Sequence, residues 1–129
     1  MFAKDIMTKD VVTVSLFDGT KKLAELLTQN QISGTPVLDG NGKIVGMVSE
    51  ADIITKRGRQ VKDIMNKQVI SVTEESTLER IALLMSTYRI KRLPVLRGKE
   101  LVGIVSRADI VGAVARGKHI AMHTPIYDL

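Results

Sequence analysis

Hydrophobic residues follow the same pattern twice along this chain. In each half, a short β-branched run is followed by apolar residues at helical spacing, then by two apolar runs separated by a glycine-containing turn, then by a second helical stretch. Short β-branched runs are typical of strands, and apolar residues three and four positions apart predict a helix with one buried face. The pattern therefore predicts the order β-α-β-β-α in each half.

The expected elements have matching positions in the two halves. Each half is expected to contain a first strand, a helix start and a second strand that begins with proline: residues 11–14, Asp18 and residues 36–39, then residues 69–72, Ser76 and residues 94–97. The second helix start is the clearer one, because Ser76 and Glu79 have the spacing of a capping box, with Ser76 as the cap. We therefore expect this helix to begin directly after Ser76.

The two halves are also similar residue by residue. The segment KDIM at residues 4–7 returns at residues 62–65, and 13 of 35 positions are identical between residues 4–38 and 62–96. Residues 44–54, IVGMVSEADII, return as LVGIVSRADIV at residues 101–111, with seven of eleven positions identical. A single unit of this size has a marginal core, so we expect the two repeats to bury a shared face.

Each repeat ends with a Ser-x-x-Asp segment at an expected helix start, Ser49 to Asp52 and Ser106 to Asp109. The free amides and the dipole of a helix N-terminus suit a phosphate, and a carboxylate at that position can accept hydrogen bonds from ribose hydroxyls. The same spacing is also that of a capping box, and spacing alone favours this second interpretation. Both interpretations stay open at this point.

The duplicated series of KDIM, a short strand, an amphipathic helix, I-x-x-x-x-P-V, a glycine-containing hairpin, V-G-x-V-S and S-x-x-D closely resembles a tandem pair of CBS (cystathionine-β-synthase) domains, a Bateman module. The resemblance extends from Lys4 to about Val114, so we expect one domain at residues 1–60, a second at 61–114 and a tail at 115–129. It implies an α+β fold in which two βαββα repeats pack through their sheets with pseudo-two-fold symmetry. It also implies a homodimer that forms a flat disc of four CBS domains.

For function, the resemblance implies an energy-sensing or other regulatory module that binds AMP, ADP, ATP or S-adenosylmethionine in two clefts between the repeats, with no further cofactor. Asp would hold the ribose, apolar residues and backbone would surround the adenine, and Ser would approach the phosphate. The first cleft is expected to contain Ser106, Arg107, Asp109, Thr8, Val12, Ile32, Ser33 and Pro36. The second is expected to contain Ser49, Asp52, Asn66, Ile70, Ile90, Lys91 and Pro94, and Arg92 follows Lys91 as a further basic residue.

The two clefts are not expected to bind equally well. Arg107 lies beside Asp109 and can pair with a phosphate through two hydrogen bonds, whereas its counterpart Glu50 would repel a phosphate. We therefore expect the cleft with Arg107 to be the stronger nucleotide site. Lys91 and Arg92 are either further phosphate contacts or exposed charges at a strand end.

Composition narrows the remaining classes of function. The 129 residues contain no cysteine, and the two histidines, His119 and His123, have no third ligand nearby, so a metal site is not expected. A net charge of +5 invites nucleic-acid binding, but the basic residues are dispersed and only four aromatic residues could stack on bases. The basic run at residues 56–59 is interpreted as a solvated linker, with a phosphate or acidic-partner contact as the alternative.

No signal peptide or apolar run of membrane-spanning length is present, so we expect a cytoplasmic protein without membrane contact. Known catalytic motifs are absent, and no histidine within the repeats could act as a general base, so we do not expect an enzyme. An interaction or assembly module with empty clefts is the main alternative, and a basic nucleic-acid binder is the third. With no effector domain attached, an unknown protein effector is expected to respond, and the tail is expected to dock across the dimer.

Overall fold

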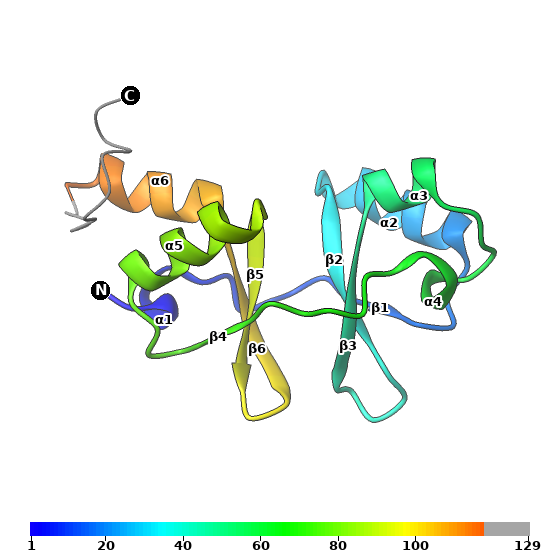
Figure 1. Ribbon diagram of the computed structural model, residues 1–129, viewed down its shortest axis with the longest axis horizontal. Helices are drawn as coiled ribbons and strands as arrows, with labels where there is room; N and C mark the ends of the chain where they lie inside the picture. Colours follow the sequence, from blue (N-terminus) through cyan, green and yellow to red (C-terminus); the bar gives the residue numbers. More distant parts are fainter. Residues whose placement is uncertain (118–129) are drawn as a thin grey trace. The chain divides into compact units, whose positions relative to one another are not determined.

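The computed structural model describes residues 1–117 of the chain. These residues form two compact units, and each unit takes its elements from both halves of the sequence (Figure 1). Unit 1 contains Met1–Asp10, Ile70–Arg97 and the chain from Val102, whereas unit 2 contains Val11–Val69 and Gly98–Leu101. Each unit is α+β, which confirms the expected fold class.

Unit 2 is built on a three-stranded sheet with the order β1-β2-β3. Its strands are β1 (Val14–Ser15), β2 (Gly34–Leu38) and β3 (Ile44–Ser49). β1 runs parallel to β2, which requires a crossover helix between them, and β2 runs antiparallel to β3. Because β1 pairs with β2 only at Val37 and Leu38, Pro36 precedes this ladder and its missing amide removes no bond from it.

The crossover helix of unit 2 is α2 (Thr20–Asn30), and β3 leads directly into α3 (Glu50–Thr55). Leu23 and Leu27, four residues apart on α2, are both buried in the core of this unit. Helix α2 ends at Gln31, which has a left-handed conformation with φ 54°. This reversal turns the chain from the helix into β2 within three residues, which places Ser33 just before the strand.

Unit 1 repeats this arrangement with a second sheet of order β4-β5-β6. Its elements are β4 (Val72–Thr73), α5 (Leu78–Tyr88), β5 (Arg92–Arg97), β6 (Glu100–Ser106) and α6 (Arg107–Ala115). β4 runs parallel to β5, and α5 ends at Arg89 with the same left-handed conformation as Gln31. The expected order β-α-β-β-α is thus confirmed in both repeats.

The KDIM segments form two short helices that the hydrophobic pattern did not predict. They are α1 (Ala3–Ile6) in unit 1 and α4 (Val61–Ile64) in unit 2. The Ala3 amide donates to the Ser76 carbonyl at 2.8 Å, and the Val61 amide donates to the Asp18 carbonyl at 2.8 Å. The segment that begins each repeat therefore packs against the turn before the long helix of the other repeat.

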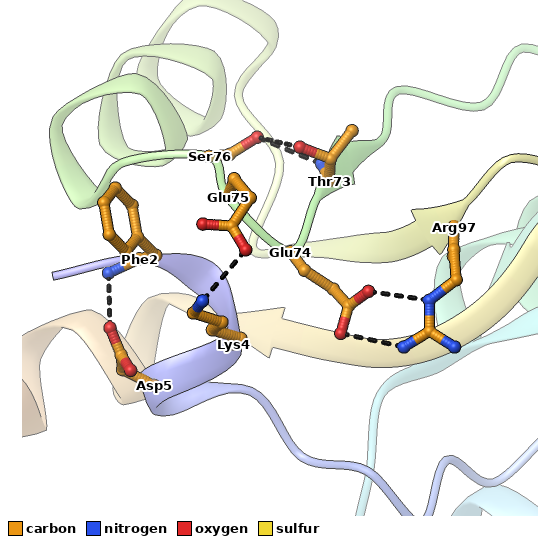
Figure 2. A network of polar contacts seen from close by, with 8 residues as sticks. All are labelled: Phe2, Lys4, Asp5, Thr73, Glu74, Glu75, Ser76 and Arg97. Carbon is orange, nitrogen blue, oxygen red and sulfur yellow. Dashed lines mark hydrogen bonds and ion pairs between the residues drawn. The ribbon is translucent and has the colours of Figure 1, made fainter.

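Charged side chains reinforce the docking of α1 in unit 1 (Figure 2). Lys4 Nζ lies 2.9 Å from Glu75 Oε1, and this hydrogen bond raises the pKa of Lys4. Nearby, Arg97 binds both carboxylate oxygens of Glu74, at 2.9 and 3.1 Å, and this contact lowers the pKa of Glu74. All four side chains are solvent-accessible, so we attribute most of the docking energy to the burial of Ala3 and to the backbone bonds.

Each unit has its own hydrophobic core, formed by its sheet and its long helix together with α1 and α6 in unit 1 and α4 in unit 2. In unit 1 the core is formed by Ala3, Val72, Leu78, Ile81, Met85, Leu93, Val95, Val105, Ile110 and Ala113. In unit 2 it is formed by Val14, Leu23, Leu27, Val37, Val48, Val61 and Ile64. Met85 is buried in the core of unit 1, and Met65 is partly buried and packs against the core of unit 2.

Several expected boundaries were wrong by a few residues. The first strands begin only at Val14 and Val72, and the second strands begin two residues before each proline. The expected capping box at Ser76 is also wrong: Ser76 Oγ accepts a hydrogen bond from the Thr73 amide, and Thr77 caps α5 by accepting from the Arg80 amide at 3.2 Å. Ser76 closes the turn after β4, so the next hydroxyl becomes the helix cap.

The expectations for the C-terminal tail fall mostly outside the described residues. Helix α6 continues to Ala115 and is followed by Arg116 and Gly117. His119, His123 and the segment expected to dock across a dimer lie beyond residue 117.

Candidate functional site

The two Ser-x-x-Asp segments form the same turn at the end of the third strand of each sheet. In unit 1, Ser106 is the N-cap of α6: its Oγ accepts from the Asp109 amide at 3.1 Å, and Asp109 Oδ2 accepts from the Ser106 amide at 2.8 Å. We call Ser106–Asp109 the α6 turn. The capping interpretation is confirmed here, and the cap occupies only one oxygen of the carboxylate.

The equivalent segment in unit 2, Ser49–Asp52, is called the α3 turn. Asp52 Oδ2 accepts from the Ser49 amide at 2.9 Å and from Ser49 Oγ at 3.2 Å, while the Asp52 amide lies 3.4 Å from Ser49 Oγ. The reciprocal pattern is that of a capping box. Both turns are therefore caps, and any ligand would have to use atoms that the caps leave over.

The two carboxylates differ in their second oxygen. Asp52 Oδ1 forms an ion pair with Lys56 Nζ at 2.9 Å. In unit 1 the position equivalent to Lys56 is Ala113, which is buried in the core and carries no charge. Within residues 1–117, the hydrogen bond from Ser106 is the only one that the Asp109 carboxylate accepts. Asp109 thus keeps an oxygen that could accept a ligand hydroxyl.

The first backbone amide of each helix is used by the chain itself. The Arg107 amide donates to the Lys91 carbonyl at 2.8 Å, and the Glu50 amide donates to the Ser33 carbonyl at 2.9 Å. Because the Asp109 amide is also used, Ala108 has the remaining amide of the first three in α6. Phosphate recognition at the α6 turn would therefore depend mainly on the exposed side chains of Arg107 and Lys91, more than on helix amides.

The segments before each first strand lie beside these turns. Thr8 exchanges two backbone hydrogen bonds with Ile104, at 2.9 and 3.0 Å, two residues before Ser106. Asn66 exchanges two with Met47, at 2.8 and 3.0 Å, two residues before Ser49.

A glycine lets each of these segments come so close. A Cβ on Gly103 would lie 2.5 Å from the Met7 sulfur, and one on Gly46 would lie 2.8 Å from the Met65 sulfur. These glycines hold Thr8 and Asn66 at their respective turns.

The residues expected to line the two clefts are divided between the units. Unit 1 contains Thr8, Ile70, Ile90, Lys91, Arg92, Pro94, Ser106, Arg107 and Asp109. Unit 2 contains Val12, Ile32, Ser33, Pro36, Ser49, Asp52 and Asn66. Each unit by itself places Thr8 and Lys91 near the α6 turn, and Asn66 and Ser33 near the α3 turn. Lys91 was expected in the cleft with Asp52 and Ser33 in the cleft with Asp109, so each lies beside the turn of the other expected cleft. The combination of residues from both units in one ligand site stays a prediction.

Two residues near the turns were not recognised from the sequence. Lys56 was interpreted as part of a solvated linker, although its spacing of four residues from Asp52 was a visible signal for an ion pair. Thr35 is fully buried, and its hydroxyl donates to the carbonyl of Val12. The sequence did contain a sign of this role: Thr35 is a polar residue within an apolar strand, and the equivalent residue of the second repeat is Leu93.

Two structural findings bear on other classes of function. Among residues 1–117, no group of three His, Asp or Glu side chains is placed to hold a metal ion. In the same part of the chain, every helix is too short or too polar to cross a bilayer.

Comparisons with known proteins agree with this architecture. The family model described as "CBS domain" matches residues 3–58 and 61–116. The protein MJ1404 of Methanocaldococcus jannaschii is 34% identical over 91% of this chain, which spans only 32% of the length of that relative.

Two solved structures have the same fold. The CBS domain pair of protein MJ0100, in complex with 5'-methylthioadenosine and S-adenosyl-L-methionine, has a TM-score of 0.85 at 29% identity, covering 92% of this chain and 98% of that one. The protein CBSX2, in complex with AMP, has a TM-score of 0.86 at 28% identity, with the same coverage. The chain therefore belongs to the CBS domain family and contains two consecutive CBS domains.

Proposed function

We propose that this chain is a regulatory ligand-binding module that binds an adenosine-containing compound, with the α6 turn as its principal ribose-binding element. The observation that carries this proposal is the state of the Asp109 carboxylate, which is held in place by the Ser106 amide and retains one oxygen without a hydrogen bond in residues 1–117. A carboxylate fixed in this way can accept hydrogen bonds from ribose hydroxyls without further ordering.

The surroundings of Asp109 support a ligand with an anionic or polar group beyond the ribose. Arg107 and Lys91 extend exposed cationic side chains from adjoining positions, linked through the bond from the Arg107 amide to the Lys91 carbonyl. The related CBS pairs named above bind AMP in one case and S-adenosylmethionine with 5'-methylthioadenosine in the other. The shared adenosine group defines the proposed ligand class. The proposed function is binding and includes no catalytic step.

Regulation would follow from a preference of the ligand for one arrangement of the chain. A ligand shifts a conformational equilibrium only by the difference between its affinities for the two states. The protein that senses this shift would be a separate partner or another part of a longer polypeptide.

The proposal is tested by a thermal-shift screen with AMP, ADP, ATP, S-adenosylmethionine and 5'-methylthioadenosine, with GMP as the base control. A ligand at a hundredfold excess over its Kd adds about 2.7 kcal/mol, which shifts the midpoint by several degrees. We expect at least one adenosine ligand to give this shift in the wild type and in Asp52→Asn, and to give none in Asp109→Asn. A screen without any shift, or a shift that survives in Asp109→Asn, contradicts the proposal.

A second function, self-association, is favoured by one specific observation. Ile54 on α3 and Val111 on α6 are equivalent positions, and 81% and 60% of their surfaces are exposed. Large apolar residues exposed at the same place in both repeats are typical of an interaction surface. We expect sedimentation equilibrium to find a dimer, and the double variant Ile54→Glu/Val111→Glu to sediment as a monomer. An unchanged mass in the double variant contradicts this function.

A further inference from the structure

The side chain of Lys56 joins two helices of unit 2. Lys56 Nζ lies 2.9 Å from Asp52 Oδ1, at the start of α3, and donates to the carbonyl of Ile64 at 3.1 Å, at the end of α4. The Ile64 carbonyl belongs to the last turn of its helix, where carbonyls lack donors from within the helix. One ammonium group thus satisfies both a capping carboxylate and a helix C-terminus.

The position of Lys56 favours this ion pair. Lys56 is the C-cap of α3, and its amide donates to the Asp52 carbonyl at 3.1 Å, so backbone and side chain both return to the same residue. An acidic residue four positions before a lysine is the more favourable orientation on a helix. The Asp52 side chain is 16% exposed and the Lys56 side chain 44%, so the pair is shielded from water on the carboxylate side only.

With Lys56 in place, the Asp52 carboxylate has fewer open acceptor positions than the Asp109 carboxylate, because a donor already occupies each of its two oxygens. Oδ2 accepts from the amide and hydroxyl of Ser49, and Oδ1 is paired with the ammonium group. A ribose hydroxyl would have to displace the ammonium group from Oδ1 or share that oxygen with it, and a charged donor binds a carboxylate more strongly than a neutral donor does. The α6 turn has no such competitor because Ala113 takes the place of Lys56.

We propose that Lys56 is the specificity-determining residue that closes the α3 turn to adenosine ligands, so that each chain binds a single ligand, at Asp109. This inference rests on the proposed function of the α6 turn. It adds a reason why the α6 turn binds an adenosine ligand and the α3 turn does not. The same contacts give Lys56 a structural role, since it holds α3 to α4 through the Ile64 carbonyl.

The experiment measures the binding of AMP and of adenosine to the full chain by calorimetry. The variants are Lys56→Met, Asp109→Asn and the combination of both. We expect one site in the wild type, a second site in Lys56→Met, no measurable site in Asp109→Asn, and the second site alone in the double variant. We expect the double variant to bind at least tenfold more tightly than Asp109→Asn, equivalent to at least about 1.4 kcal/mol.

Two control variants separate this effect from general changes in charge or folding. Lys56→Arg keeps a cation in reach of Asp52 and is expected to bind one ligand, as the wild type does. Lys62→Met removes a lysine from the same unit that contacts the Phe17 ring and not Asp52, and it is also expected to bind one ligand. Thermal midpoints without ligand show that each variant is folded.

Three results would overturn the proposal. If Lys56→Met weakens AMP binding and leaves adenosine binding unchanged, Lys56 is a phosphate ligand. If Lys56→Met still binds one ligand while Asp109→Asn binds none, Lys56 does not prevent binding at the α3 turn, and the proposed function of the α6 turn stands. If neither the wild type nor Lys56→Met binds AMP or adenosine, and the screen above also finds no ligand, the inference and the proposed function fail together.

Discussion

The α6 turn and the α3 turn have the same backbone but different electrostatics. Both begin with a serine cap, both reuse the aspartate carboxylate to bind the serine amide, and both follow the last strand of a sheet. They differ at two neighbouring positions. The residue after the serine is Arg107 in one turn and Glu50 in the other, and the residue four positions after the aspartate is Ala113 in one and Lys56 in the other.

The comparison shows that a duplicated turn can keep its capping hydrogen bonds while the charges around its carboxylate change. The cap stabilises the helix start in both copies, so it is retained whether or not a ligand binds. In one copy Arg107 adds an exposed cation two residues before Asp109, whereas in the other Lys56 is paired with the Asp52 carboxylate itself.

The largest expected effect is on AMP binding, from reversing the charge of Arg107, the residue that follows Ser106. In Arg107→Glu we expect AMP affinity to fall about tenfold, because an exposed attraction becomes a repulsion, and we expect adenosine affinity to stay within about twofold. Calorimetry at low and moderate salt measures both ligands, and the AMP effect should shrink as salt screens it. Glu50→Arg is the matched control in unit 2 and should leave AMP binding at Asp109 unchanged. Equal losses for AMP and adenosine would show that Arg107 acts on the turn and not on the phosphate.

Removing the two serine caps should have a smaller effect, on stability. We expect Ser106→Ala to lower the free energy of unfolding by about 1 kcal/mol, because the Asp109 amide loses its acceptor. Ser49→Ala should cost less, about 0.5 kcal/mol, because the bond from the Asp52 amide is longer, at 3.4 Å, and because Lys56 and the Ser49 amide still hold the Asp52 carboxylate when the 3.2 Å bond from the hydroxyl is lost. Urea unfolding measures both values. A larger cost for Ser49→Ala would contradict the view that Lys56 supports the α3 turn.

The smallest expected effect is on the pH dependence of stability, through the turns that precede the long helices α2 and α5. In unit 2, Asp18 Oδ2 accepts from the Ser15 amide at 2.9 Å, whereas in unit 1 the equivalent Ser76 uses a hydroxyl. Burial opposes ionisation of Asp18, but the bonds from Ser15 and Lys22 outweigh it and lower the pKa. Asp18 therefore stabilises the fold above its ordinary pKa of about 3.9, and this stabilisation is lost as the pH falls through the lowered value.

We test this by urea unfolding at pH 6 and pH 3. Between these values the wild type should lose about 0.5 kcal/mol more than Asp18→Asn, since the asparagine cannot titrate. Ser76→Asp is the reciprocal variant and should add acid sensitivity to unit 1. An acid dependence that is the same in the wild type and Asp18→Asn would show that this turn does not depend on the charge.

Much of the fold could be predicted because the repeat presents each local signal twice. The order β-α-β-β-α, the two Ser-x-x-Asp turns and the buried helix faces all follow from spacing within one segment. Local signals were less reliable at boundaries: Ser76 and Thr77 are adjacent hydroxyls, and the sequence could not show which one closes the turn and which one caps α5.

By itself, the sequence determined that this chain is a pair of CBS domains with two similar turns, because hydrophobic period and capping chemistry act over a few residues. Only the tertiary structure decided which partner each segment has. It placed α1 in unit 1 and α4 in unit 2, and it brought the Ile64 carbonyl within 3.1 Å of Lys56. The physical reason is that a helix of four residues has no stable fold of its own, so its position depends on the surface that buries it.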